Sequence, residues 1–329
     1  MSPRAFTIGC LTAIASVAAC GRSRTERADA GAVARGGGAV HASSFDPTAW
    51  QPPAEADIPR DSLGASIRRG LALVTHTTDS LPAYAPGRIN CTNCHLNAGR
   101  NAEAAPLAGS FARFPKYMER TGAVIGLADR VNYCFTRSLA GNRLPVESRE
   151  MQDILAYLAW LSTGVPVGEG KKLPGAEGIL PMQSQLTGDK TRGGAVFTAK
   201  CAACHGVDGQ GNPAIPPGVP ALWGIRSFSV GASMARQGKA ASFIWHNMPF
   251  GAAKSLTAQE AFDVAAYVTS QSRVDSPGKE GDWPARGAPA DVPYVTAGHA
   301  AFAPPPLLAR ANGREAVVPR PTSAARKSR

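Results

Sequence analysis

Two short motifs of the form CxxCH, at residues 91–95 and 201–205, have the residue types and spacing needed to attach haem covalently. Two thiols three positions apart can form thioethers to both vinyl groups of one haem, while the histidine that follows ligates its iron. A CxxC pair that serves zinc or dithiol redox chemistry needs no histidine there and gives no reason for a repeat. We therefore expect two covalent haem c groups, held by Cys91, Cys94, His95, Cys201, Cys204 and His205.

The ligand opposite each histidine decides what each haem can do. For the second haem, haem 2, Met248 follows His205 by 43 residues and lies in a Met-Pro pair just before the predicted last helix. Thioether ligation raises the reduction potential and suits electron transfer. Met234 and His246 are rival ligands, and a methionine that only packs in the core is the remaining alternative.

The corresponding region of the first haem, haem 1, has no Met-Pro pair but contains Cys134, 39 residues after His95. A thiolate ligand would lower the potential of haem 1 relative to haem 2. Nearby arginines and a ferric iron would both favour the ionised thiol. The alternatives are a buried, inert cysteine and ligation by Met118 or Met151.

The two halves of the chain repeat one another, which indicates two copies of one fold. Arg69-Gly70 has its counterpart in Arg192-Gly193, and 66 residues separate the first motif cysteine from a tyrosine in both halves, at Tyr157 and Tyr267. Apolar residues at helical spacing predict a helix after Pro145, and Thr257 with Glu260 forms a capping box ahead of another. Helices before each CxxCH motif and at each domain end resemble class I cytochrome c and predict an all-α fold.

Composition divides the chain into segments. We expect two tandem cytochrome c-like domains, 51–165 around haem 1 and 191–275 around haem 2, joined by a Gly/Pro/Lys-rich linker at 166–190. A flexible linker at 21–50 precedes them, an extension at 276–305 packs on the domains, and a basic disordered tail follows at 306–329.

The first 20 residues predict export. An apolar run follows Arg4 and is too short to span a membrane, as in a signal peptide. The run ends in a sequence that resembles a bacterial lipobox, so a lipid anchor at Cys20 and a membrane-anchored protein in the periplasm are expected; plain cleavage is the alternative.

The net charge of +11 is concentrated at the chain ends, with +3 in residues 1–36 and +5 in residues 306–329. No nucleic-acid-binding motif accompanies them, so nucleic acid is not an expected partner. Residues 88–143 carry eight Lys and Arg against three acidic residues, a local excess that attracts small anions to haem 1.

The stretch RVNYCFTRS at 130–138, followed by GNRLP at 141–145, resembles the bacterial thiosulfate dehydrogenases. These dihaem cytochromes couple two thiosulfates to tetrathionate. The similarity covers most of residues 60–296, including GDWP at 281–284 and DVPY at 291–294. It implies an enzyme whose substrates are thiosulfate and tetrathionate and whose electrons pass from haem 1 to haem 2 and then to a soluble or membrane-linked cytochrome.

The resemblance also implies roles for single residues. Cys134 is implied as both the haem 1 axial ligand and the sulfur acceptor, Arg120, Arg130 and Ser138 as the anion-holding residues, and Met248 as the haem 2 ligand. Some family members have a lysine before that methionine that can replace it at the iron; Asn247 stands there in this chain, so we expect no such switch. The alternative functions are a dihaem electron carrier without its own substrate and a peroxidase-type dihaem enzyme.

Overall fold

The structure is a computed structural model that describes residues 45–183, 186–215, 218–298 and 307–308. The chain separates into two units, Met1–Ala42 and Ser43–Arg329, and the described residues all belong to the second. The predicted signal peptide, Cys20, most of the linker at 21–50 and nearly all of the tail at 306–329 lie outside the described residues. In the part of the chain that is described, no helix has both the length and the apolarity needed to cross a membrane.

The haem 1 half is built from helices whose ends are set by polar side chains. The Asp61 carboxylate accepts a hydrogen bond from the Gly64 amide at the start of the first helix, and the Ser148 hydroxyl caps the last one. The helices are α1 (Ser62–Thr75), α2 (Thr77–Ser80), α3 (Leu96–Gly99), α4 (Leu127–Tyr133) and α5 (Arg149–Trp160). A single π-helical turn, Cys134–Ser138, continues α4.

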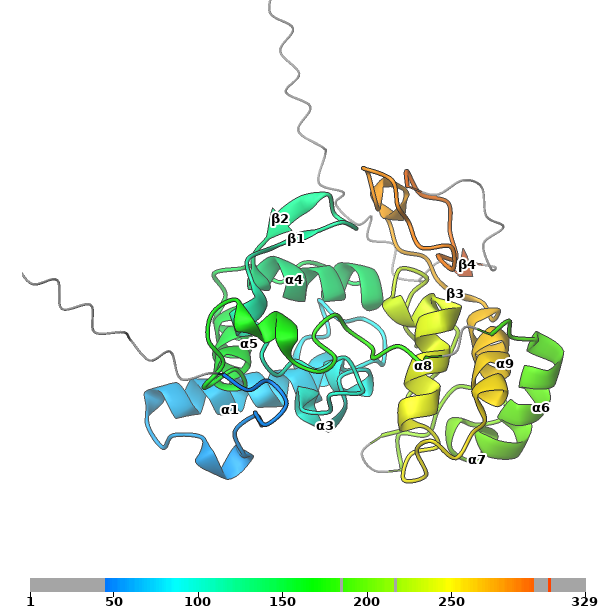
Figure 1. Cartoon of the computed structure of the whole chain (residues 1–329), viewed down its shortest axis with the longest axis horizontal. Helices are drawn as coiled ribbons and strands as arrows, with labels where there is room; N and C mark the ends of the chain where they lie inside the picture. The colour runs from blue at the N-terminus through cyan, green and yellow to red at the C-terminus, as the bar shows by residue number, and fades with distance from the viewer. Residues whose placement is uncertain (1–44, 184–185, 216–217, 299–306, 309–329) are drawn as a thin grey trace, which may run out of the picture. The chain divides into compact units, whose positions relative to one another are not determined.

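The haem 2 half has the same plan, and its last helix begins at the predicted capping box of Thr257 and Glu260. Its helices are α6 (Lys190–Lys200), α7 (Ala202–His205), α8 (Gln237–Asn247) and α9 (Ala258–Thr269). Figure 1 shows α8, α9 and α6 packed side by side. The fold is therefore the predicted pair of cytochrome c-like domains, with helices dominant throughout.

Two small sheets depart from a purely helical fold. Strands β1 (Lys116–Met118) and β2 (Ala123–Ile125) form an antiparallel hairpin, and β3 (Arg273–Val274) pairs in parallel with β4 (Leu307–Leu308). The hairpin displays Arg120 in its turn, which matters for the site described below.

The internal repeat is visible in how the opening and closing helices of each half cross. A Cβ atom on Gly70 would lie 2.0 Å from the Asp153 carbonyl oxygen, and one on Gly193 would lie 1.9 Å from the Asp263 carbonyl oxygen. Only glycine allows this approach of α1 to α5 and of α6 to α9. Arg69 and Arg192 then clamp the Asp153 and Asp263 carboxylates of the closing helices, with closest N–O distances of 2.6 and 2.7 Å.

Two segments predicted as linkers pack against the domains instead. Trp50, within the predicted linker 21–50, donates its indole N–H to the Thr163 carbonyl oxygen at 3.0 Å. In the predicted linker 166–190, Leu173, Ile179 and Met182 are buried. Composition alone missed these contacts because single apolar residues, without helical or strand periodicity, anchor both segments.

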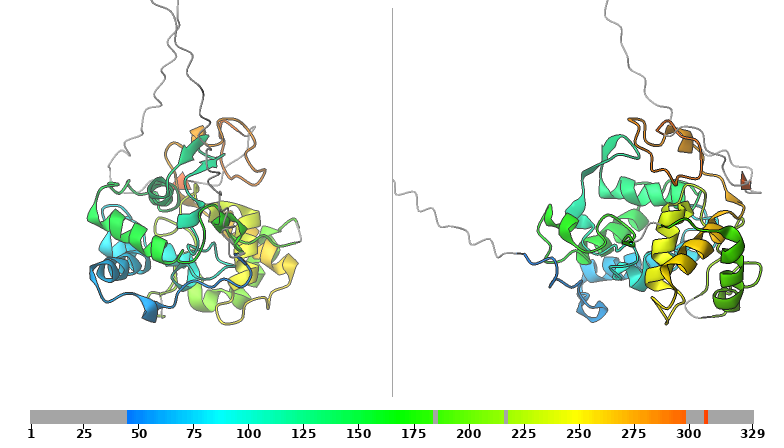
Figure 2. Two further views of the ribbon diagram at one scale, coloured as in Figure 1. Left: turned by 60° about the vertical axis from the view of Figure 1, so that its left-hand side comes forward. Right: turned by 45° about the vertical axis from the view of Figure 1, so that its right-hand side comes forward.

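The C-terminal segment, residues 276–298, also packs on the rest of the molecule. Trp283, Val292 and Tyr294 are buried in one cluster with Val230. Figure 2 shows this segment, in orange, beside the β1–β2 hairpin, and the Trp283 amide donates to the Arg120 carbonyl oxygen at 2.9 Å. A segment far along the chain thus reaches the haem 1 half.

Candidate active site

The histidines of both CxxCH motifs are oriented by backbone carbonyl groups. His205 Nδ1 lies 3.0 Å from the Pro220 carbonyl oxygen, and His95 Nδ1 makes the same contact with the Ala105 carbonyl oxygen. A protonated Nδ1 that donates to a carbonyl leaves Nε2 as the free lone pair, which is the tautomer that ligates haem iron. Burial also lowers the pKa of His205 and keeps that imidazole neutral.

The motif cysteines are free thiols beside these histidines. Burial raises the pKa of Cys91 and Cys201 to about 11 and that of Cys94 to about 12. These three thiols are therefore protonated, and they are available for thioether bonds. Together with the oriented imidazoles, this donor set fits a covalently attached haem in each half.

Cys134 lies at the start of the π-helical turn, where the structure brings it to Arg130 and His95. Arg130 Nη1 donates to Cys134 Sγ at 2.8 Å. Burial by itself raises the pKa of this thiol, but the charge of Arg130 and the contacts from His95 and Arg130 lower the pKa to about 6. Cys134 is therefore the cysteine of the described chain that is poised as a thiolate, next to the proximal histidine of haem 1.

Ser138 closes the same turn, four residues after Cys134. Its carbonyl oxygen accepts a hydrogen bond from the Ser229 amide at 2.9 Å, while its hydroxyl has no partner among the described residues. The backbone of Ser138 is thus fixed against the haem 2 half, and its side chain is left for a ligand.

Arg120 is held by a buried carboxylate that the sequence analysis did not identify. Arg120 Nε donates to Asp282 Oδ2 at 3.0 Å, and its Nη2 donates to the Tyr294 hydroxyl at 2.6 Å and to the Gly231 carbonyl oxygen at 2.7 Å. Tyr133 and Trp283 cover the guanidinium, whose carbon lies 5.4 and 5.0 Å from their ring centres. Most of the donors predicted to hold an anion are therefore occupied by protein groups.

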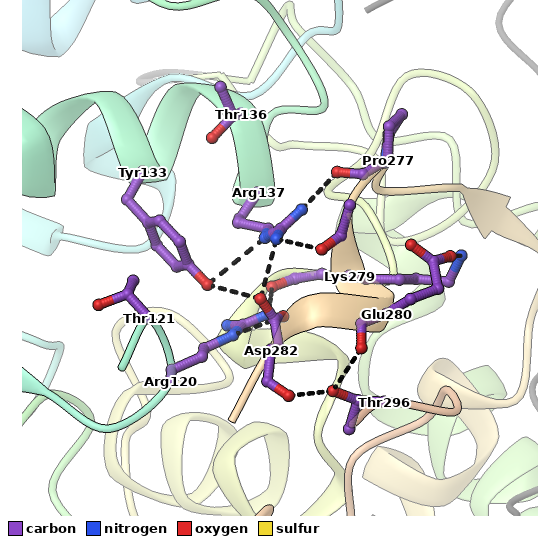
Figure 3. A network of polar contacts seen from close by, with 12 residues as sticks. Arg120, Thr121, Tyr133, Thr136, Arg137, Pro277, Lys279, Glu280, Asp282 and Thr296 are labelled. Atoms are coloured by element: carbon purple, nitrogen blue, oxygen red, sulfur yellow. Dashed lines mark hydrogen bonds and ion pairs between the residues drawn. The ribbon is translucent and has the colours of Figure 1, made fainter. Parts of the chain in front are cut away.

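Asp282 is the centre of this network, which Figure 3 shows. Its Oδ1 accepts from the Tyr133 hydroxyl at 3.0 Å and from Arg137 Nη2 at 2.8 Å, and its Oδ2 accepts from Arg120 and from Tyr294. Asp282 is 2% exposed. Because Tyr133 and Arg137 flank Cys134 and Ser138 in sequence, one carboxylate ties the Arg120 side chain to the helix that carries the candidate ligand.

Sequence patterns held only an indirect signal for these partners. The segments around Asp282 and Tyr294 belong to the family resemblance, and Arg137 is one of several cationic residues near haem 1. Asp282 is 162 residues from Arg120, so no local pattern links the two.

Met248 ends α8 and packs beside Phe243, Leu96 and Ala105, at the contact between the two halves. Its rival Met234 belongs to the same cluster, so packing does not distinguish them. The other rival, His246, is 6% exposed; its Nδ1 lies 3.2 Å from Glu103 Oε1 but lacks hydrogen-bond geometry.

The competing ligands for haem 1 differ in their surroundings. Met151 is completely buried in the core that joins α1 to α5, and Met118 lies partly buried on β1. Neither is placed by a contact with His95, whereas Cys134 is.

Asn247 joins the two halves directly. Its Oδ1 accepts from Asn101 Nδ2 at 2.9 Å, and its Nδ2 donates to the carbonyl oxygens of Glu103 at 3.2 Å and of Phe243 at 3.0 Å. Where other family members are expected to place a lysine, this chain thus has a buried amide with its polar atoms satisfied.

Comparison with known proteins agrees with this architecture. Residues 83–167 match the family model described as "SoxA/TsdA, cytochrome c domain", and residues 191–272 match the model described as "Cytochrome c". The fold and the two oriented CxxCH motifs define a dihaem c-type cytochrome, and the chain carries two covalent haem c groups.

The particular family follows from whole-chain relatives. A thiosulfate dehydrogenase of Psychrobacter arcticus is 40% identical over 257 residues, which cover 78% of this chain and 77% of the relative. A thiosulfate dehydrogenase of Allochromatium vinosum is 40% identical over 240 residues, covering 71% and 88%. The chain belongs to the thiosulfate dehydrogenase family.

A solved structure gives the same result. The thiosulfate dehydrogenase (TsdBA) from Marichromatium purpuratum matches with a TM-score of 0.68 and 32% identity, covering 74% of this chain. This chain covers 55% of that longer chain.

Proposed function

We propose that this protein oxidises two thiosulfate ions to one tetrathionate at haem 1 and passes the two electrons through haem 2 to a soluble or membrane-linked cytochrome. The observation that carries the proposal is the Cys134 thiol, which lies beside both His95 and the Arg130 guanidinium. The family membership and the two haem c groups support it. The carrier and peroxidase alternatives leave this thiol without a role.

The chain's own residues bring the first anion to Cys134. Arg130 is next to the sulfur, and the unoccupied Ser138 hydroxyl is one turn away. A guanidinium offers planar donors to sulfonate oxygens and offsets the repulsion between a thiolate and a dianion. Arg120 reaches the same region only through the atoms that Asp282 and Tyr294 leave free, and we propose that it orients the sulfonate.

The sulfur chemistry balances with two electrons and no protons. The Cys134 thiolate and the terminal sulfur of thiosulfate form an S–S bond, releasing two electrons and leaving an enzyme-bound S–S–SO₃⁻ group. A second thiosulfate attacks the sulfur that carries the sulfonate, which releases tetrathionate and restores the thiolate. When bound, the two haems supply two one-electron acceptors for this oxidation.

Replacement of Cys134 tests the proposal. In Cys134→Gly, we expect both haems to stay attached and thiosulfate-dependent haem reduction to fall at least a hundredfold, since the sulfur acceptor is lost. Arg130→Gln should lower kcat/KM by about tenfold or more, the effect of losing one charged contact of about 1.4 kcal/mol. The matched control is Arg143→Gln, because Arg143 pairs with Asp129 in an exposed salt bridge. A fully active Cys134→Gly protein would exclude the mechanism.

We also propose that residues 1–20 direct export to the periplasm and that Cys20 anchors the mature protein to a membrane by a lipid. The support is the apolar run and the lipobox-like sequence around Cys20. Cys20→Ala should release a haem-loaded protein from the membrane fraction, and an unmodified Cys20 in the mature wild-type protein, seen by mass spectrometry, would contradict the anchor.

A further inference from the structure

Arg273 is a buried cation with an unused donor. It begins β3, directly after the last helix of the haem 2 half, and it is 0% exposed. Its Nη2 donates to the Val268 carbonyl oxygen at 2.7 Å, its Nη1 lies 3.5 Å from the Phe228 carbonyl oxygen, and its Nε has no partner among the described residues. The guanidinium carbon stacks 4.4 Å from the Phe228 ring centre.

No protein carboxylate in the described part of the chain offsets this charge. No Asp or Glu side chain there lies within ion-pair distance of Arg273, whereas the buried Arg120 has Asp282. Burial alone lowers the pKa of Arg273 to about 10. A buried guanidinium without an anion is costly unless another group supplies the negative charge.

The position of Arg273 indicates which group that is. Phe228, on which Arg273 stacks, ends the loop that begins at Pro220, whose carbonyl orients His205. The Ser227 hydroxyl donates to the Ala221 carbonyl oxygen at 2.8 Å and folds this loop on itself, and the Gly224 amide donates to the carbonyl oxygen of Ser272, next to Arg273, at 2.8 Å. Arg273 is therefore attached to the loop that holds the proximal histidine of haem 2.

The haem 1 half repeats the arrangement with a different residue. Arg113 lies eight residues after Ala105, the acceptor of His95 Nδ1, just as Phe228 lies eight residues after Pro220. Arg113 also donates to carbonyl oxygens, those of Pro106 and Ala176, and its buried Nε also lacks a partner among the described residues. Burial lowers the pKa of Arg113 to about 10 as well. Both halves thus place a buried guanidinium with one unused N–H at the same point of the histidine loop.

We propose that Arg273 binds a propionate carboxylate of haem 2 through its Nε. A covalently held haem brings its own carboxylates into each half, and a buried Arg with a free N–H is a strong donor to such an anion. Arg113 occupies the equivalent place in the haem 1 half. This assignment concerns cofactor binding and does not depend on which substrate the protein oxidises.

The test uses the full-length protein with both haems and measures the reduction potential of haem 2 in a spectroelectrochemical titration. Loss of a nearby positive charge disfavours the reduced haem. In Arg273→Gln, we expect the equilibrium constant for reduction to fall about tenfold, which is about 59 mV for one electron. The propionate bending band in the resonance Raman spectrum should shift in the same variant.

Arg226→Gln is the matched control, because Arg226 carries the same charge on the same loop but donates to the Gln210 side chain. It should leave both readouts near their wild-type values. Arg273→Lys keeps the charge without the guanidinium geometry, so it should retain the potential and still shift the propionate band.

Two results would overturn the assignment. One is an unchanged potential and an unchanged propionate band in a haem-loaded Arg273→Gln protein. If that variant does not fold, an unchanged propionate band in Arg273→Lys has the same meaning. A variant that loses only thermal stability would show that Arg273 serves packing through its carbonyl and ring contacts alone.

Discussion

Asp282 neutralises two arginines at once and fixes where each can point. Arg120 and Arg137 lie 14% and 12% exposed at their side chains, and both donate to this one carboxylate. Burial by itself would lower the pKa of Arg120, but Tyr133 and Asp282 raise it above its ordinary value. The charge that reaches a bound anion from Arg120 is therefore set by a residue that does not touch the anion.

Replacing Asp282 by Asn should affect stability and substrate binding together. Breaking a buried ion pair from one side costs about 3 kcal/mol of folding free energy. Because Arg120 loses its orientation, the KM for thiosulfate should rise about tenfold, the ratio given by about 1.4 kcal/mol, with a smaller change in kcat. Urea unfolding and steady-state kinetics measure the two effects.

The control is Asp275→Asn, since Asp275 is 40% exposed at its side chain and pairs with Lys279. Its effect on stability should stay within about 0.5 kcal/mol. An Asp282→Asn enzyme with an unchanged KM would show that Arg120 needs no such positioning.

Single residues differ in how far sequence could place them. Arg130 and Cys134 are four positions apart on one helical element, so their contact follows from helical spacing. Arg120 and Ser138 were identified through the family resemblance, and their surroundings stay hidden because Asp282 and Ser229 come from distant segments. The roles assigned to these residues stay predictions.

Helix pairing is the part of the fold that sequence predicts best. The matched spacing of the two halves anticipated that the opening and closing helices correspond, and the structure shows the same Gly and Arg contacts in both. The irregular segments were harder, since hydrogen bonds such as that between Trp50 and Thr163 leave no periodic pattern.

Gly193→Ala should weaken the α6–α9 crossing. Its Cβ would lie 1.9 Å from the Asp263 carbonyl oxygen, so the helices must separate, at a cost of about 1–3 kcal/mol. Gly194→Ala is the control, because its Cβ would meet the Tyr267 ring at 3.4 Å. That variant should be neutral or gain up to about 1 kcal/mol from helix propensity. Chemical unfolding followed by circular dichroism compares them, and equal midpoints for both variants would contradict the close-crossing argument.

At the scale of the whole molecule, the C-terminal segment connects both halves. Asp282 bonds to Arg120 and Arg137 of the haem 1 half, while Asp291 pairs with Arg236 of the haem 2 half at 2.7 Å. Asn247 adds a second connection through Asn101. Sequence predicted an extension that packs but not that it bridges, since bridging depends on long-range partners.

A chain that ends at Asp275 should therefore lose part of its cooperativity. Wild-type protein is expected to unfold in one calorimetric transition, and the truncated chain in two, because the charged contacts between the C-terminal segment and each half are gone. Asn247→Ala, which removes the other connection, should broaden the wild-type transition without splitting it. A single sharp transition in the truncated chain would show that the remaining contacts suffice to couple the halves.

The contact between Arg120 and Asp282 closes a loop of 162 residues, and the whole haem 2 half lies inside that loop. Closing such a loop is favourable only after the intervening chain has become compact, since the entropy of closure rises with loop length. Folding order follows from this topology: the polar surroundings of haem 1 are completed last. A defect in attaching haem 2, for instance at Cys201, is therefore expected to leave Arg120 without its carboxylate and to disable a catalytic centre in the other half of the chain.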